Sequence, residues 1–192
     1  MPRLVEPSLP AGALARLAQP TLEGDGLRLR PWRVGDGPDV VRAYADPGIQ
    51  RWHVKTMTSA EALAWVQSWP QRWAQETGAG WAVVDLDDSE LLGQISLRRL
   101  NLGDGLAELS YWVTPAARGR GVAGRAVSRL STWGFGELGL HRIEIEHSTQ
   151  NAASCAVAVA AGFVAEGVKR GEGWHADGWH DMHLHARLSS DS

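Results

Sequence analysis

The chain has 192 residues, of which 44% are hydrophobic and 21% charged, a composition that supports one folded domain and excludes an intrinsically disordered chain. Nineteen lysines and arginines against 22 aspartates and glutamates give a net charge of −3, which argues against a nucleic-acid-binding surface. The single cysteine, Cys155, excludes a disulfide framework and a zinc site built from several cysteines. No apolar run reaches the ~20 residues that a membrane span needs, so we expect a cytoplasmic protein that binds neither membrane nor nucleic acid.

Residues 1–20 carry four prolines and little hydrophobic periodicity, which predicts a loosely ordered N-terminal extension. Residues 21–192 are expected to form a single mixed α/β domain, because strand-like and helix-like periodicities alternate along them. In chain order the predicted elements are a strand over 27–30, helices over 36–45 and 59–76, strands over 81–86, 91–97 and 106–113, a helix over 119–138, a strand over 140–147, a helix over 151–161 and two strands within 163–188. The segment from 106 to 147 predicts a parallel crossover, with helices on both faces of the sheet.

Two local features refine this assignment. Asp36 is expected to cap the first helix, which Asp46 and Pro47 should end. Ten tryptophans form an unusual aromatic set, and Trp65, Trp69 and Trp73 recur at four-residue spacing on one helix face. Core packing is the simpler interpretation of these three rings, and an aromatic wall beside a substrate cleft is the alternative.

The sharpest local signal is a glycine- and arginine-rich turn between a predicted strand and a predicted helix. The turn consists of Arg118, Gly119, Arg120, Gly121, Val122, Ala123 and Gly124. Glycines let backbone N–H groups approach a ligand, the helix N-terminus adds partial positive charge, and arginines favour phosphate. The turn therefore predicts an anion-binding site.

Two known phosphate loops fit this turn poorly. A P-loop is excluded because no Gly-Lys-Ser/Thr follows. The dinucleotide pattern GxGxxG is present, but five residues, Pro115 among them, separate Val113 from Gly119, where that pattern needs the turn directly after the strand. An NAD-dependent dehydrogenase is thus a weak alternative.

The turn resembles the coenzyme A loop of the GNAT acetyltransferase superfamily, Gln/Arg-x-x-Gly-x-Gly/Ala, which here is Arg118-x-x-Gly121-x-Ala123. Residues 107–113 before the loop and the segments 151–157 and 161–163 after it extend the resemblance. Their spacing is similar to that of the branch that acetylates protein N-termini, including those of ribosomal proteins.

This resemblance implies a mixed, mostly antiparallel sheet of about seven strands that splays at the coenzyme site. It also implies transfer of an acetyl group from acetyl-coenzyme A to a primary amine in a ternary complex, with no metal. A protein N-terminal α-amine is the favoured acceptor, and a small-molecule amine or an aminoglycoside is the alternative. A non-catalytic acetyl-coenzyme A binding protein and a homodimer are also compatible with the resemblance.

Acetyl transfer needs a base, because an α-amino group with a pKa near 8 is mostly protonated at neutral pH. Glu108 lies within a strand expected to be central, just before the coenzyme loop, and is the predicted base. The competing interpretation is a glutamate held in a structural ion pair. Glu144 and Glu146, on the neighbouring strand, are the alternatives.

The other predicted site residues follow from the resemblance. Trp112 and Val113 are expected beside the thioester, and Asn151 as a helix cap that also contacts the coenzyme. Many relatives carry a tyrosine acid seven residues after the asparagine, where this chain has Ala158. Ser154 is therefore the predicted acid for the leaving thiolate, against the simpler role of bonding its own helix backbone.

The sequence predicts no catalytic or metal-binding role for the cysteine or the histidines. A lone Cys155 in an alanine-rich helix is expected to be a small buried hydrophobe rather than a nucleophile. Asp181, His183 and His185 share a strand face and form a conceivable metal trio, but their spacing lacks the pattern of a structural metal site. We therefore expect no bound metal. His147, in the predicted strand 140–147, is expected to be a histidine with satisfied hydrogen bonds in the sheet.

Overall fold

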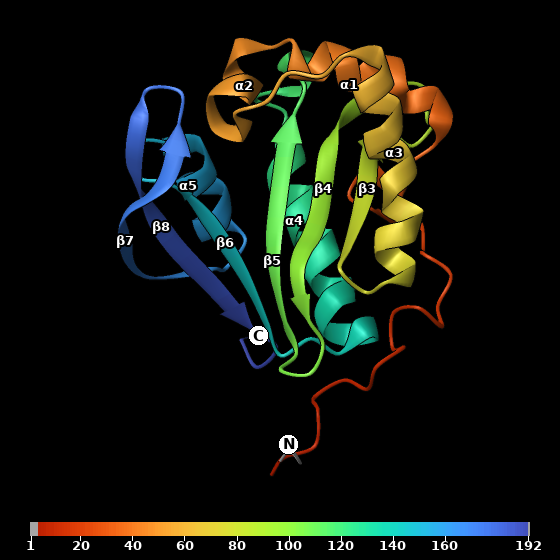
Figure 1. Ribbon diagram of the computed structural model, residues 1–192, viewed down its shortest axis with the longest axis vertical. Coiled ribbons are helices and arrows are strands. Elements are labelled where there is room, and N and C mark those ends of the chain that lie inside the picture. The colour runs from red at the N-terminus through yellow and green to blue at the C-terminus, as the bar shows by residue number, and fades with distance from the viewer. Residues whose placement is uncertain (1–3, 192) are drawn as a thin grey trace.

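A computed structural model describes residues 4–191 and confirms the predicted mixed α/β fold, a mostly antiparallel sheet with helices on both faces (Figure 1). The strands are β1 (Leu22–Gly24), β2 (Leu27–Pro31), β3 (Gly78–Val84), β4 (Leu91–Asn101), β5 (Leu106–Val113), β6 (Arg142–Ser148), β7 (Val164–His175) and β8 (Gly178–Leu188). The helices are α1 (Gly37–Tyr44), α2 (Pro47–His53), α3 (Ser59–Ala74), α4 (Val122–Trp133) and α5 (Ala152–Ala160). No helix in residues 4–191 is long and apolar enough to cross a membrane.

The sheet has eight strands in the order β1-β2-β3-β4-β5-β6-β8-β7, one more than expected because the three-residue β1 was not predicted. Every neighbouring pair is antiparallel except β5 and β6, which are parallel and joined by the expected crossover through α4. That parallel pairing covers only three residue pairs, from Leu106↔Arg142 to Glu108↔Glu144. Beyond Glu108 the two strands diverge toward the end of the sheet where α2 lies (Figure 1).

Helix α2 was not among the predicted elements. The sequence Asp46-Pro47 ends one helix and also begins the next: the Asp46 carboxylate accepts a hydrogen bond from the Ile49 N–H at 2.9 Å, and Pro47 fills the first helical position. A stop signal and a start signal coincide here. Helix α2 therefore carries Trp52 and His53 above the gap between β5 and β6.

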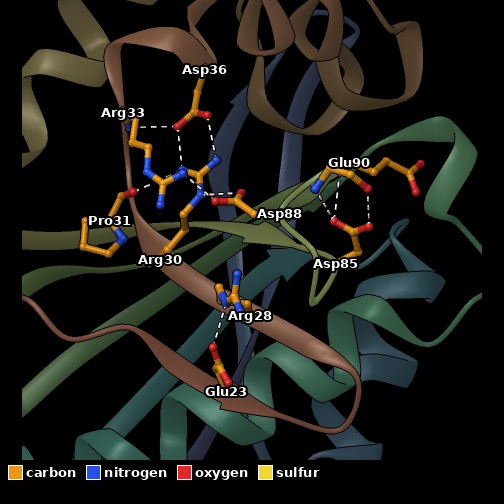
Figure 2. A network of polar contacts seen from close by, with 10 residues as sticks. Glu23, Arg28, Arg30, Pro31, Arg33, Asp36, Asp85, Asp88 and Glu90 are labelled. Carbon is orange, nitrogen blue, oxygen red and sulfur yellow. Dashed lines mark hydrogen bonds and ion pairs between the residues drawn. The ribbon is translucent and has the colours of Figure 1, made fainter.

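Asp36 was expected to cap α1, but its side chain makes no capping hydrogen bond to that helix. Instead, both carboxylate oxygens accept from the Arg30 guanidinium at 2.8 Å (Figure 2). Arg30 is 5% exposed and also donates to Asp88 at 2.7 Å, in the β3–β4 turn. A buried guanidinium needs such partners, so this network joins β2, α1 and the hairpin turn.

Two hydrophobic cores cover the two faces of the sheet. One packs α4 against strands β1–β6, and the other packs α1–α3 against β3–β5. Trp69 of α3 lies flat on β3, where a Cβ added to Gly80 would stand 2.5 Å from the indole. Trp73 instead reaches Trp81 and Trp133 in the α4 core, with ring centroids 6.0 and 6.1 Å away. The tryptophans of α3 are therefore divided between two cores.

Residues 8–20 make specific contacts with the rest of the protein, so they are packed less loosely than expected of the extension. The expected domain boundary at residue 20 stays a prediction. The Glu76 carboxylate accepts from the backbone N–H groups of Gly12 and Leu14, both at 2.7 Å. The Trp73 indole N–H donates to the Leu17 carbonyl at 2.8 Å, and Leu14 is fully buried in the α4 core. Local periodicity gave no sign of this docking because its partners lie about sixty residues away.

Docking of the extension predicts a contrast between two leucines. Leu14→Ala should lower the free energy of unfolding by about 2–4 kcal/mol, because it empties a filled core position. Leu17 is 46% exposed, so Leu17→Ala should change stability by less than about 0.5 kcal/mol. Urea unfolding of both variants measures the difference in stability. A loss for Leu14→Ala as small as that for Leu17→Ala would mean that the extension contributes nothing to the core.

Candidate active site

A cavity of about 470 Å³ lies against the glycine-rich turn, and its walls come from β5, α2, α4 and α5. Of the predicted coenzyme-binding residues, ten line it: Trp112, Val113, Arg118, Gly119, Gly121, Val122, Ala123, Gly124, Asn151 and Ser154. Arg120 does not; its guanidinium lies 3.4 Å from Glu90. Chain segments 48–53, 111–124 and 151–157 thus meet around one space.

The turn has the geometry of an anion cradle. Gly121 is the N-cap of α4 in the left-handed conformation (φ +70°), and no side chain caps the helix. No atom lies within 4 Å of a Cβ added at Gly119 or Gly124, so the approach to the backbone is open. The first N–H groups of α4 can therefore bind an anion. Arg118 lies on the same wall, paired with Asp46 of the α2 cap.

A second cavity of about 300 Å³ opens between α3 and the sheet where β5 and β6 separate. Trp65, Trp69 and Glu146 are among its lining residues, so part of the α3 tryptophan face does form a cleft wall. This cavity shares five lining residues with the first: Trp52, His53, Tyr111, Asn151 and Ser154. The two spaces therefore border one another at these side chains.

Ser154 and Tyr111 form a hydroxyl pair at this junction. The Ser154 Oγ and Tyr111 Oη atoms are 2.8 Å apart, and either can donate. Burial raises the pKa of Tyr111 to about 12, so the phenol keeps its proton at neutral pH. Sequence reasoning missed Tyr111, although it is one of only two tyrosines in the chain. A phenol from strand β5 thus lies beside Ser154, in a chain that has alanine at position 158.

Asn151 has the predicted capping role. Its side-chain oxygen accepts from the Ser154 N–H at 3.1 Å, which fixes the first turn of α5 at the edge of both cavities. The Ser154 hydroxyl is thereby held toward β5.

His53 covers the open edge of β5. Its Nε2 atom lies 3.1 Å from the Tyr111 carbonyl oxygen, which has no partner strand on that side beyond Glu108. Burial lowers the pKa of His53 to about 4, opposed by this hydrogen bond and assisted by Arg98 and Lys55. The ring is therefore neutral at pH 7 and donates its Nε2 proton to the carbonyl.

Glu108 is buried, with its side chain 3% exposed, and is not among the cavity-lining residues. It forms ion pairs with Arg98 and with Arg99, the latter at 3.0 Å. Glu146 does line the second cavity, pairs with Lys169, and has Arg99 3.8 Å away. Arg99 thus stands between the two carboxylates. Glu144 is turned toward Arg142, at 2.7 Å.

A model of the acetyltransferase (GNAT) domain matches residues 26–164. The chain belongs to the GNAT acetyltransferase family, and its expected class, an N-acetyltransferase, is confirmed. It is 30% identical over 153 residues to the uncharacterized N-acetyltransferase YoaA of Bacillus subtilis (strain 168), which covers 79% of this chain and 86% of that protein.

The expected similarity to the ribosomal branch is also confirmed. The ribosomal-protein-serine acetyltransferase of Escherichia coli (strain K12) is 30% identical over 101 residues, or 53% of this chain and 56% of that protein. A solved structure of RimL, described as a ribosomal L7/L12 α-N-protein acetyltransferase in complex with coenzyme A, has the same fold. Its TM-score is 0.81 at 19% identity, over 88% of this chain and 98% of that one.

The glycine cradle predicts a difference between two substitutions of one residue. Asparagine and aspartate both tolerate the left-handed conformation of Gly121 and have nearly the same shape. Gly121→Asp adds a negative charge at the anion site and should weaken acetyl-coenzyme A binding by about 100-fold, whereas Gly121→Asn should stay within about tenfold of wild type. Calorimetric titration with acetyl-coenzyme A measures both affinities. Wild-type affinity in Gly121→Asp would remove the turn from the coenzyme site.

The lowered pKa of His53 predicts a pH-dependent stability. Between about pH 6.5, the ordinary histidine value, and pH 4, the unfolded chain binds a proton at His53 that the folded chain does not. Stability therefore falls as pH falls through this window. His53→Gln keeps a donor for the Tyr111 carbonyl and should lose less stability on acidification. Urea midpoints at about pH 7 and pH 5 provide the comparison; identical losses in the two proteins would show that His53 titrates normally.

Proposed function

We propose that this protein transfers the acetyl group of acetyl-coenzyme A to a primary amine in a ternary complex, and that the amine is a protein N-terminal α-amine. The observation that carries the proposal is the meeting of the two cavities at Ser154 and Tyr111. Coenzyme and acceptor can enter from different sides and meet at this junction, so direct attack needs no covalent acetyl-enzyme. Relatives named as ribosomal-protein acetyltransferases support a protein acceptor.

The proposed roles follow from where the side chains lie. The free N–H groups of α4 and Arg118 bind the pyrophosphate. The Ser154–Tyr111 pair supplies a proton to the sulfur as the carbon–sulfur bond of the thioester breaks and coenzyme A leaves, and it regains a proton from the acylated nitrogen, which becomes the amide. The amine loses its proton to a carboxylate at the β5–β6 gap before its lone pair attacks the carbonyl carbon. Trp65 and Trp69 provide the apolar wall against which the acceptor packs.

Two carboxylates compete for the role of base. Glu108 was the prediction from sequence, and its two arginine partners are those of a structural ion pair. Glu146 lines the acceptor cavity and is the better placed of the two to reach an amine. The proposed base is therefore Glu146, with Glu108 holding Arg99 beside it.

The two glutamine variants test this assignment. Glu146→Gln should lower kcat by about 10²–10⁴-fold with acetyl-coenzyme A affinity nearly unchanged, as expected when a general base is lost. Glu108→Gln should mainly lower stability, by about 1–3 kcal/mol, because it leaves Arg98 and Arg99 without their shared anion. Steady-state rates and urea unfolding of both proteins separate the roles. A large fall of kcat in Glu108→Gln alone would assign the base to Glu108.

The acceptor class is tested by thiol release from acetyl-coenzyme A. Peptides with free N-termini, the same peptides with blocked N-termini, polyamines and amino sugars are compared at equal amine concentration. The proposal expects turnover with free N-terminal peptides and none with the blocked controls. Turnover restricted to polyamines or amino sugars would make the protein a small-molecule acetyltransferase. Tight coenzyme binding without turnover on any amine would make it a coenzyme-binding protein.

A further inference from the structure

Three histidines and the single cysteine meet on the face of the sheet that α5 covers. His147 of β6 is paired in register with His183 of β8, and His185 lies two residues further along the same face. Cys155 faces them from α5. One ligand atom from each of the four side chains lies within 4.8 Å of the others, and the Cys155 Sγ is 3.9 Å from the His185 Nε2.

This group differs from the trio considered in the sequence. Asp181 takes no part in it, because its carboxylate accepts from the Gly171 N–H at 2.8 Å. His147 and Cys155 take its place. They come from another strand and a helix, so spacing along the chain gave no signal.

Two of the four cluster residues are buried and two are half-buried, and some of their nitrogen atoms lack polar partners. His147 is 5% exposed and His185 1% exposed. In the described part of the chain, the His147 Nε2 and His183 Nδ1 atoms are buried and have no hydrogen-bond partner. Buried polar atoms in native proteins are nearly always paired, so these two nitrogens point to a missing ligand.

The tautomer of His147 suits a metal ligand. Its Nδ1 atom lies 2.8 Å from the backbone carbonyl of Ser148, which can only accept, so Nδ1 carries the proton. The neutral ring then presents the lone pair of Nε2, the unpartnered atom. A carbonyl that fixes the opposite nitrogen is the usual outer partner of a ligating histidine.

We propose that His147, Cys155, His183 and His185 bind one zinc ion in a four-coordinate site beneath α5. Imidazole and thiolate are ligands that zinc prefers, and four protein ligands make a closed, structural site. Bonds of about 2.0–2.3 Å place tetrahedral ligand atoms roughly 3.3–3.8 Å apart, so the side chains need to close by about 1 Å. The Cys155 thiol loses its proton on binding, and three neutral imidazoles with one thiolate leave a net charge of +1.

The site would link α5 to β6 and β8. Cys155 directly follows Ser154, and Ser154 contacts Tyr111 at the junction of the two cavities. The zinc would therefore fix the first turn of α5 against the sheet, and through His147 the site would border the second cavity. This inference requires no particular acceptor and does not depend on the proposed reaction.

Cobalt spectroscopy of the tag-free full chain tests the proposal. After removal of metals by chelation, one equivalent of Co²⁺ should produce the visible ligand-field bands of tetrahedral cobalt and a near-ultraviolet thiolate-to-cobalt charge-transfer band. One equivalent of Zn²⁺ should abolish both. Zinc should also raise the melting temperature of the chelated protein, because it binds the folded state.

Variants distinguish this cluster from adventitious binding. Cys155→Ser should remove the charge-transfer band, and both it and His183→Ala should weaken zinc binding by about 100-fold or more. His141→Ala, an exposed histidine outside the cluster, should bind zinc as wild type does. Circular dichroism checks that each variant is folded. The cobalt spectrum of the wild-type protein tests the proposal even if a variant fails to fold. Absence of tetrahedral bands in wild type, or bands that persist in both cluster variants, would overturn the proposal.

Discussion

The separation of β5 from β6 is the feature on which the rest of the site depends. A parallel pair of three residues holds the strands together at one end, and past Glu108 each loses the other as a partner. A sheet interior that opens in this way leaves backbone groups to be satisfied by other means. His53 takes one of them, the Tyr111 carbonyl, and the remaining space becomes the two connected cavities. The opening is thus a structural cost that creates the site.

Charged side chains bind the separating strands to one another. Arg99 at the end of β4 contacts Glu108 of β5 and approaches Glu146 of β6, and Lys169 of β7 completes the chain of ion pairs. Both glutamates are largely buried, and a buried carboxylate needs a cation nearby. The same charges that hold the strands in register also give the acceptor cavity an anionic group beside a cation.

Different interactions hold the helices around the opening in place. The Asp46 carboxylate caps α2 and also pairs with Arg118. The glycine-rich turn and α2 therefore share one aspartate. α3 is held by its tryptophans in two separate cores. α5 packs against the α4 core through Ala158, and its Cys155 faces the histidine cluster of β6 and β8.

Short-range chemistry controls the features that the sequence predicts well. The glycine-rich turn, the start of α3, strand β5 and the capping role of Asn151 all follow from glycine conformation, capping and alternation within a few residues. The long-range partners of each side chain follow from the tertiary structure alone. Glu108 lies in ion pairs because β4 presents two arginines to it, and His147 meets Cys155 because α5 folds back over β6. Such contacts depend on strand register and helix placement across tens of residues, which local patterns do not encode.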